Sequence, residues 1–595
     1  MAEIDEKDLW EPAELFGEFE AATYDQWRRA AEESLKGAPF EKRLVTKTYE
    51  GINLAPMYWP KDVEGLELAK SLPGTFPFAR GTAQAGHLES PWVIAQQTVE
   101  PTPDRANEVL AHDMARGQTG IHLVLDRPTR LFTDADHATG QVGVDGLSLC
   151  TAADAKTLFA GLDPAAPLHV DAGALALPLL CLLAAGREQA GLNAPPAGVV
   201  GADPLAELAA TGSLTLDFTP AFDAMAAAVL LARESFPGLR TILVSAQPYH
   251  NAGAGAEKEL AFAMATAAEY ARAMGQRGLT ADDVFASMAL SFSVGRNMLM
   301  EIAKLRAARV LFAMVAEAFG ASEQAAKAHV HARTSWWTKT AYDPYTNMIR
   351  NTTEAFAAVM GGVDSLHVGF FDELVRHPGE FSRRVSRNLQ VLLQAEARFI
   401  RPVDPAGGSW CVESLTWELG EKAWSLFQEI EGDGGMTQAL YAEGPQQACA
   451  DTAAQKRVDV ERRKEVFVGV NKYPNLEEKP LEDVWPDYET VASRRMEEVA
   501  RARHGAGAPA VESAVADVVS ARMGGDLSAM GGKCLEAARA GATLGALGGA
   551  LAAGGDSLPS VRELDFSRGA EVFEDLRKNA ERMEQETGKR PRVFL

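Results

Sequence analysis

Short apolar runs alternate with longer amphipathic segments through most of the chain. Between most of the runs, apolar residues recur three and four positions apart, as in AEKELAFAMATAAEYARAMG, which predicts helices. Strands separated by crossover helices favour a parallel sheet, so the pattern predicts an α/β fold, a closed (β/α)8 barrel of the TIM type. The eight predicted strands are GIHLVLD (120–126), LHVDAG (168–173), GVVGAD (198–203), LTLDF (214–218), TILVSAQPYH (241–250), VFASMALSFSV (284–294), HVHARTSW (329–336) and SLHVGFF (365–371).

The predicted barrel also indicates where chemistry should lie. Active sites of (β/α)8 barrels gather at the carboxyl ends of the strands. Polar or aromatic residues stand at three such ends: Tyr249-His250, Thr334-Ser335-Trp336, and the residues after His367.

The rest of the chain is predicted to be largely helical. We expect residues 1–45 to form an amino-terminal helical arm and residues 46–430 to hold the barrel. A charged helical linker is expected over 431–510, and a further helical segment over 511–595. That segment ends in RPRVFL, which predicts the first strand of a domain that is otherwise missing.

The stretch TAYDPYTNMIRNTTEAF (340–356) combines an acidic turn with a polar helix start. Pro344 fixes the turn, and Thr346 or Asn347 is expected to cap the first amides of the helix. A helix start after a strand is also a ready ligand site. The stretch therefore has two interpretations, an ordinary turn or part of a binding site.

The charge balance excludes several classes of function. The chain has 58 basic and 82 acidic residues, a net charge of −24, so it lacks the basic field that non-specific nucleic-acid or anionic-membrane binding needs. Its five cysteines show no ligand spacing, which suits a reducing compartment. The start, MAEIDEKDLW, lacks the features of a secretion signal. We expect a cytoplasmic protein.

The histidines were also considered as metal ligands. His329 and His331 alternate on a predicted strand, and with His367 they could in principle bind a metal. No carboxylate or cysteine falls at a helpful spacing. We therefore expect no metal site.

Several motifs, in order along the chain, carry a family resemblance. The chain resembles the adenosylcobalamin-dependent acyl-CoA mutases, above all the methylmalonyl-CoA mutases, over nearly its whole length. The resemblance implies that the barrel encloses a CoA chain along its axis and that the DPY-N turn lines the mouth where the corrin sits. The matching passages are LPGTFPFARG, PWVIAQ, SAQPYHNAGAGAEKELAF, RNMLMEIAKLRAARVLF, TAYDPYTNMIRNTTEAFAAVMGGVDSLHVGFFDE, RPVDPAGGSW and VGVNKYPN.

The resemblance also implies how the cofactor is held. Such mutases bind cobalt through the histidine of a D-x-H-x-x-G motif in a flavodoxin-like cobalamin domain. The nearest stretch here is DADHATG (134–140), in which the aspartate adjoins His137, and we expect it to be a surface turn. The cobalamin domain is expected to be absent or truncated. Adenosylcobalamin is expected in the complex but not on this chain.

Several family positions are altered. His87 stands where the family has the tyrosine over the reacting carbons, and Ala95 stands where it has an arginine. In VHARTSW, Arg333 replaces a glutamine and Trp336 replaces a glycine, which is expected to fill space that a substrate needs. The arginine that pairs with the substrate carboxylate has no counterpart near AATGSLTLDF.

Tyr249 and His250 match the family's Y-H pair, whose histidine donates to the thioester carbonyl. His250 is therefore the candidate catalytic residue, although a histidine at a strand end is also commonly structural. The candidate substrate-binding residues are His87, Tyr249, His331, Arg333, Thr334 and Asn347.

Together these features predict the small, non-catalytic (β) subunit of a methylmalonyl-CoA mutase. Its partner would be a homologous large subunit that interconverts methylmalonyl-CoA and succinyl-CoA, with the amino-terminal arm wrapping that subunit. One alternative is the catalytic chain of a split acyl-CoA mutase with a separate cobalamin-binding subunit. Another is an interaction module that recruits a chaperone for the cofactor. Whether a CoA ester enters the barrel is left open.

Overall fold

The computed structural model describes residues 22–192, 194–479, 481–505, 507–553, 558–589 and 591. The chain divides into two compact units, Met1–Gly65 and Leu66–Leu595. Residues 1–21 of the expected arm lie outside the described residues. So does most of the terminal RPRVFL run, and the strand expected there stays a prediction.

The first unit is small and held by aromatic contacts. Thr23 and Gln26 form a capping box, because each side chain accepts the other residue's backbone N–H at the start of α2. The rings of Trp27 and Phe40 meet edge to face at 6.0 Å between centroids. Its elements are α2 (Tyr24–Ser34), α3 (Phe40–Leu44), the antiparallel pair β1 (Thr46–Lys47) and β2 (Asn53–Leu54), and the 3-10 helix η2 (Pro60–Val63).

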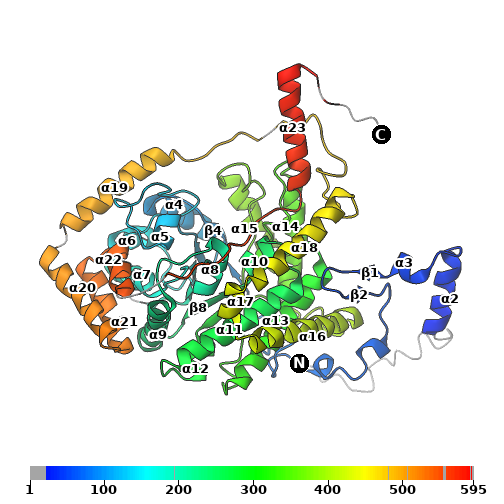
Figure 1. Ribbon diagram of the computed structural model, residues 1–595, viewed down its shortest axis with the longest axis horizontal. Coiled ribbons are helices and arrows are strands. Elements are labelled where there is room, and N and C mark those ends of the chain that lie inside the picture. Colours follow the sequence, from blue (N-terminus) through cyan, green and yellow to red (C-terminus); the bar gives the residue numbers. More distant parts are fainter. Residues whose placement is uncertain are drawn as a thin grey trace, which may run out of the picture. The chain divides into compact units, whose positions relative to one another are not determined.

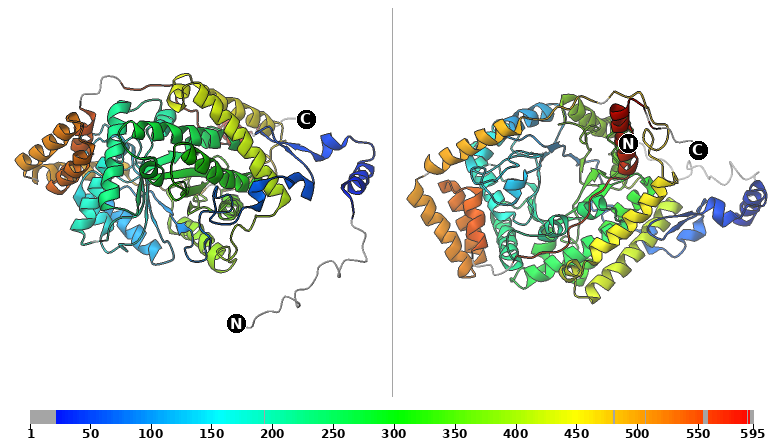
Figure 2. Two further views of the ribbon diagram at one scale, coloured as in Figure 1. Left: turned by 90° about the horizontal axis from the view of Figure 1, so that it is seen from below. Right: turned by 45° about the horizontal axis from the view of Figure 1, so that its top comes forward.

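A parallel sheet forms the centre of the second unit, in the strand order β3-β11-β10-β9-β8-β7-β6-β5-β4. The two edge strands, β3 and β4, are consecutive pieces of one extended run, separated by Ala95 and Gln96. The sheet therefore curls round until its edges meet, which confirms the α/β barrel (Figure 2). The strands are β3 (Val93–Ile94), β4 (Gln97–Thr98), β5 (Ile121–Leu123), β6 (Leu168–Asp171), β7 (Gly198–Ala202), β8 (Leu239–Ser245), β9 (Met288–Val294), β10 (Val330–Thr334) and β11 (Ser365–His367).

One predicted strand is wrong and another was missed. LTLDF (214–218) is not part of the sheet, because Asp217 caps helix α9 by accepting the Phe218 amide. Its neighbour Ser213 makes only an isolated antiparallel bridge, to Ser560. The missed strand is the split run 93–98, which is short and carries the polar pair Gln96-Gln97.

Helices between the strands cover the outside of the barrel (Figure 1). Helix α7 is buried along nearly its whole length because α6 and α21 pack against it, which explains its uniformly apolar sequence. These helices are α4 (Pro103–Met114), α5 (Arg127–Arg130), α6 (Ala152–Phe159), α7 (Leu177–Gln189), α8 (Pro204–Thr211), α9 (Phe218–Ser235), α10 (Gln247–Asn251), α11 (Ala256–Gly275), α12 (Ala281–Ala286), α13 (Met298–Ala318), α14 (Thr346–Met360) and α15 (Glu380–Ala395); the 3-10 helix η3 (Glu67–Lys70) precedes the barrel.

The remaining helices form an outer layer. Helix α16 lies against α11 and α13, and α21 and α22 lie against α7 and α9 (Figures 1 and 2). None of the described helices has the length and apolar character needed to cross a membrane. The layer comprises α16 (Trp410–Gly432), α17 (Met436–Tyr441), α18 (Gly444–Glu461), α19 (Tyr488–Gly505), α20 (Ala508–Met523), α21 (Leu527–Ala540), α22 (Leu544–Ala552) and α23 (Glu571–Thr587).

Residues 558–570, termed here the crossing segment, run over the barrel towards α23 (Figure 1). The Val561 N–H donates to the carbonyl of Gly212 at the end of α8, and the Ser567 N–H donates to that of Asn251 at the end of α10. The Gly569 N–H then donates to a carbonyl in the loop after β10. The segment thus crosses connections that follow β7, β8 and β10.

Candidate active site and barrel interior

His250 lies at the carboxyl end of β8, on the short helix α10, and is 8% exposed. Its Nδ1 is 2.8 Å from a carboxylate oxygen of Glu259, and its Nε2 is 2.7 Å from the hydroxyl of Ser335. The Glu259 carboxylate can only accept, so the His250 ring donates to it from Nδ1–H. In the neutral ring Nε2 then accepts a hydrogen bond from the Ser335 hydroxyl. Both ring nitrogens of the candidate catalytic histidine are therefore engaged within the protein.

A buried charge network stands behind His250. The ammonium of Lys304 lies 2.8 Å from Glu259, 2.6 Å from Glu301 and 2.7 Å from the carbonyl of Ser293. Burial raises the pKa of Glu259, but the charge of Lys304 and the hydrogen bonds from His250 and Lys304 outweigh it, and the net shift is downward. Burial also raises the pKa of Glu301, and the Lys304 charge only partly offsets this. The network holds Glu259 ionised and fixes the orientation of His250.

The hydrogen bonds link a serine, a histidine and a carboxylate, Ser335, His250 and Glu259, as in acyl-transfer triads. A triad serine must reach an acyl carbon, however, and Ser335 is wholly buried. We interpret the arrangement as a clamp on the histidine.

Tyr249 points into the helical layer. Its ring packs against Phe262 of α11 at 4.9 Å between centroids, and its hydroxyl has no hydrogen-bond partner among the described residues. Burial raises the pKa of this phenol well above its usual value. Tyr249 and His250 are adjacent in sequence but make different contacts.

Four histidine rings meet inside the barrel: His122 on β5, His169 on β6, His331 on β10 and His367 on β11. His122 and His169 are register partners on neighbouring strands, and their ring centroids are 4.5 Å apart. The rings of His169 and His331 stack at 3.6 Å, and His122 lies 5.1 Å from His331 and 5.8 Å from His367. Strands β7, β8 and β9 separate β6 from β10, so the stacked pair spans the barrel interior.

Three of these histidines have a hydrogen bond at Nδ1, and in His367 this atom accepts the Gln97 amide at 3.2 Å. His122 Nδ1 is 3.2 Å from the carbonyl of Ala95, and His331 Nδ1 is 2.8 Å from the hydroxyl of Ser365. The carbonyl can only accept, so His122 carries its proton on Nδ1 and has a free electron pair on Nε2.

Other ring nitrogens of the cluster lack partners. His169 Nδ1, His331 Nε2 and His367 Nε2 are buried without a hydrogen bond to the described residues. Burial lowers the pKa of His122 to about 4 and lowers the pKa values of the other three rings well below the usual range. One nitrogen from each of His122, His169 and His331 lies within 4.8 Å of the others.

The histidines considered from the sequence as metal ligands do not come together as a set. His331 and His367 face the interior, but His329 precedes β10 and lies 3.9 Å from the carboxylate of Asp364. There it lines a pocket of about 530 Å³ with Arg240. His329 was expected to share a strand face with His331, but strand β10 begins only at Val330.

Arg333 and Thr334 make contacts within the protein. The guanidinium of Arg333 lies 3.3 Å from both carboxylate oxygens of Glu373. The Thr334 hydroxyl donates to Asn351 at 3.0 Å and accepts the Gly369 amide at 2.8 Å. Both predicted substrate-binding residues thus tie β10 to neighbouring elements.

Asn347 has a structural role. Its amide nitrogen donates to the carbonyls of Thr340 at 2.9 Å and Phe371 at 2.8 Å, and its oxygen accepts the Thr340 amide at 3.1 Å. It therefore joins the turn before α14 to the loop after β11. This pairing explains the polar start of α14.

The expected helix cap at this point is wrong. Helix α14 begins at Thr346, its cap position is Tyr345, and no side chain caps it. The Thr346 hydroxyl instead donates to Asp343 at 2.7 Å, within the turn.

Trp336 packs against the crossing segment. The guanidinium carbon of Arg568 is 5.9 Å from its ring centroid, and the Gly569 amide donates to the Trp337 carbonyl at 3.0 Å. The residue expected to fill substrate space thus has a partner at the mouth of the barrel.

His87 lies at the other end of the barrel from His250. Its Nδ1 is 3.3 Å from the carbonyl of Ser90, and its ring meets that of Trp92, just before β3, at 5.6 Å. The pocket it lines, about 240 Å³, includes Asp364, which precedes β11. His87 thus belongs to the amino-terminal end of the strands, and the structure does not bring it together with His250.

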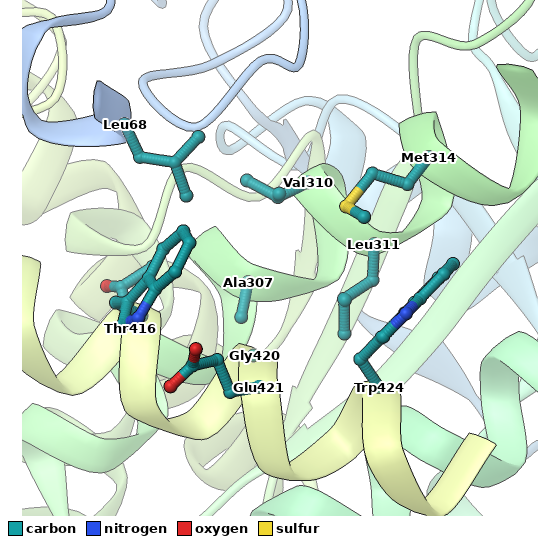
Figure 3. A pocket seen from close by; sticks show the side chains of 10 residues that line it. Leu68, Ala307, Val310, Leu311, Met314, Thr416, Gly420, Glu421 and Trp424 are labelled. Carbon is teal, nitrogen blue, oxygen red and sulfur yellow. The ribbon is translucent and has the colours of Figure 1, made fainter. Parts of the chain in front are cut away.

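A separate apolar groove of about 240 Å³ lies between α13 and α16 on the outside of the barrel. Figure 3 shows Leu311 and Met314 of α13 facing Trp424 of α16 across it. Glu421 is the one ionisable side chain among the described residues that line it. The groove therefore suits an apolar contact rather than chemistry.

Comparisons with known proteins agree with the architecture. The family model described as methylmalonyl-CoA mutase matches residues 47–556. The chain is 34% identical to a methylmalonyl-CoA mutase of Rhizobium meliloti, over 96% of this chain and 82% of the relative. It is 35% identical to the methylmalonyl-CoA mutase small subunit of Streptomyces virginiae, over 79% of this chain and 73% of the relative. It is 32% identical to the methylmalonyl-CoA mutase large subunit of the same organism, over 96% of this chain and 80% of the relative. Identity alone therefore does not separate the two subunit types.

Proposed function

This chain belongs to the methylmalonyl-CoA mutase family, a family of isomerases, and we propose that it is the small, non-catalytic subunit of such a mutase. Its role is to support a homologous large subunit that interconverts methylmalonyl-CoA and succinyl-CoA. The proposal rests on the interior of its barrel.

The stacked pair of His169 and His331 carries the proposal. The family resemblance implies a CoA chain threaded along the barrel axis. Here two rings from opposite walls are in contact at 3.6 Å, and His122 and His367 lie beside them. An acyl-CoA could pass only if these buried rings moved apart, and close-packed interiors resist such displacement.

The charges near the axis support the same conclusion. Arg333 is already paired with Glu373, so it is not free to pair with a substrate carboxylate. A buried carboxylate without a partner costs several kcal/mol, which disfavours a dicarboxylic acyl group at this place. His250, the residue matching the family's carbonyl donor, holds Ser335 at its Nε2.

The proposed partner is a homologous mutase subunit. Relatives named as large and small subunits occur in one organism, which supports a two-subunit assembly. Around α14 and α15 the chain also exposes large apolar side chains, which are characteristic of protein interfaces. They are Tyr345, Ile349, Phe381 and Leu392.

The family also implies adenosylcobalamin, and we assign that cofactor to the partner. A histidine that held the cobalt would need a free ring nitrogen. Both nitrogens of His250 are engaged, and His137 lies on an exposed turn with its Nε2 2.8 Å from Arg503. Neither His250 nor His137 therefore offers a free nitrogen to cobalt.

Turnover assays test the subunit role. The purified chain, given adenosylcobalamin and methylmalonyl-CoA, is expected to be inactive. Co-expression with the large subunit from the same source should yield an active complex that contains both chains. Turnover by the isolated chain would refute the proposal.

The alternative, a catalytic chain that borrows a separate cobalamin-domain protein, is favoured only by the position of His250 at a strand end. Under that alternative, adding such a protein together with adenosylcobalamin and methylmalonyl-CoA would produce cob(II)alamin, detectable by electron paramagnetic resonance, and His250→Asn would weaken the signal. Under the subunit role no such signal appears.

A further inference from the structure

We propose that His122, His169 and His331 form a buried site for one divalent transition-metal ion of the zinc type, inside the barrel. The ion would join strands β5, β6 and β10 across the interior. The inference uses only the placement of these side chains and does not depend on the subunit role.

The first argument is the convergence of three ring nitrogens. One nitrogen from each ring lies within 4.8 Å of the others. Nitrogens bound to one tetrahedral zinc ion, at about 2.0–2.1 Å from the metal, stand about 3.3 Å apart. The rings of His169 and His331 stack at 3.6 Å with their planes 23° apart, so both must turn about their side-chain bonds before their in-plane electron pairs converge on one ion.

The second argument is the hydrogen bonding behind the rings. Ligating histidines usually donate their other N–H to a carbonyl, carboxylate or hydroxyl, which fixes the tautomer. His122 has its Nδ1 on the Ala95 carbonyl and His331 has its Nδ1 on the Ser365 hydroxyl. In both rings Nε2 is left for the metal.

The third argument is the cost of the unpaired nitrogens. His169 Nδ1 and His331 Nε2 are buried without a partner among the described residues, in side chains that are at least nine-tenths buried. A buried polar atom with no partner is unfavourable, and native proteins rarely keep several of them together. A metal ion would satisfy both atoms at once.

The donor set selects the class of metal. Three imidazoles suit zinc, copper, nickel or iron, whereas calcium and magnesium require oxygen ligands.

The test uses the full chain without a histidine tag. The protein is unfolded in urea with a chelator, refolded with or without Zn²⁺, and desalted, and its metal content is measured by mass spectrometry. We expect about one zinc per chain and a higher melting temperature for the zinc-loaded sample. Refolding with Co²⁺ should give the visible absorption of a tetrahedral site.

Three variants locate the site. His169→Gln should lose the bound zinc, and Ser365→Ala should weaken zinc affinity by about 10- to 100-fold because it removes the support of His331. His329→Gln is the matched control, since His329 is a largely buried histidine of the same strand region but lies outside the cluster. It should keep about one zinc per chain.

Two results would overturn the proposal. One is a wild-type chain that refolds with Zn²⁺ but retains less than about a tenth of an equivalent. The other is an equal loss of bound zinc in His169→Gln and His329→Gln, which would mean that the metal is not bound by the His122, His169 and His331 cluster. The wild-type measurement stands even if a variant fails to fold.

Discussion

Asp203 shows how one buried carboxyl joins three elements of the barrel. One of its oxygens accepts the Ala206 amide at 3.0 Å and so caps α8, and the other accepts the Ser245 amide at 2.7 Å at the end of β8. The hydroxyl of Tyr270 on α11 donates to it as well. Burial nevertheless outweighs these donors and raises the pKa of Asp203 to about 7.

This raised pKa predicts a pH dependence of stability. Between about pH 4 and pH 7 the unfolded chain has lost the Asp203 proton while the native protein keeps it, so the native state binds more protons. Stability must therefore fall as pH rises through this range, by at most about 1.4 kcal/mol per pH unit from this group. Asp203→Asn should remove that part of the slope in urea unfolding curves recorded at several pH values.

The control for this prediction is a cap that does not titrate. Thr543 caps α22 by accepting the Ala546 amide at 3.2 Å, so Thr543→Ala should cost about 1 kcal/mol at every pH. If the free energy of unfolding changed with pH equally in the wild type and in Asp203→Asn, Asp203 would not be the source of the pH dependence, even if the variant is less stable overall.

At this scale the sequence predicted some of the interior residues and missed others. His331 was recognised with His367, but His122 and His169 were overlooked, although both stand within predicted strands. The alternation of a strand tells which residues share a face, but not which strands face each other across a barrel. The contact between His169 and His331 depends on closure of the sheet, which no local pattern encodes.

At the scale of elements, α13 is anchored by a charge that has no access to water. Lys304 is wholly buried and pairs with Glu259 of α11 and Glu301 of its own helix. Lys304→Met would leave a buried carboxylate without its cation, and we expect a loss of about 3–5 kcal/mol in the free energy of unfolding. Chemical denaturation monitored by circular dichroism measures it.

Lys464 provides the matched lysine. It pairs with Asp459 at 2.8 Å, but its side chain is 68% exposed. Lys464→Met should change stability by less than about 0.5 kcal/mol. Equal effects of the two substitutions would mean that the buried network contributes no more than a solvated pair.

The crossing segment gives a prediction about local opening. A methyl group on Gly569 would come within 2.4 Å of the Phe467 ring and 2.6 Å of the Trp337 ring. Gly569→Val should therefore lift the segment, and the amides of Val561, Leu564 and Ser567 should exchange faster with deuterium.

Gly549 on α22 serves as the comparison for this substitution. A methyl group there meets nothing within 4 Å, so Gly549→Ala should leave exchange in the crossing segment unchanged. Unaltered exchange in Gly569→Val would show that the segment is held by contacts other than those at the glycine.

Most of the strands, but not all, could be predicted as elements. Buried parallel strands such as β8 have largely apolar sequences, and the prediction found β8, although the end of the predicted strand 241–250 forms helix α10. The split strand 93–98 has only two residues in each piece and contains the polar pair Gln96-Gln97, so it lacks that signal. LTLDF does have an apolar strand-like pattern, but its Asp217 caps helix α9, so the chain begins a helix there.

For the whole molecule, sequence and structure together describe a closed barrel of the mutase family with the stacked rings of His169 and His331 in its interior. The resemblance identified the architecture, because the scaffold motifs are kept. It could not show which side chains fill the interior. That depends on rings from β5, β6, β10 and β11 meeting at one level of the barrel.

This filled interior predicts that the isolated chain does not bind CoA along its axis. To admit the pantetheine chain, the rings of His169 and His331 would have to separate and their strands to move, and no ligand contact is available to offset that cost. Equilibrium dialysis should therefore show no saturable binding up to about 1 mM CoA, equivalent to a binding free energy weaker than about −4 kcal/mol. A catalytic mutase of the family serves as the positive control. If the wild type did bind tightly, and His169→Trp abolished that binding, the axis would be a working channel and the subunit role would have to be abandoned.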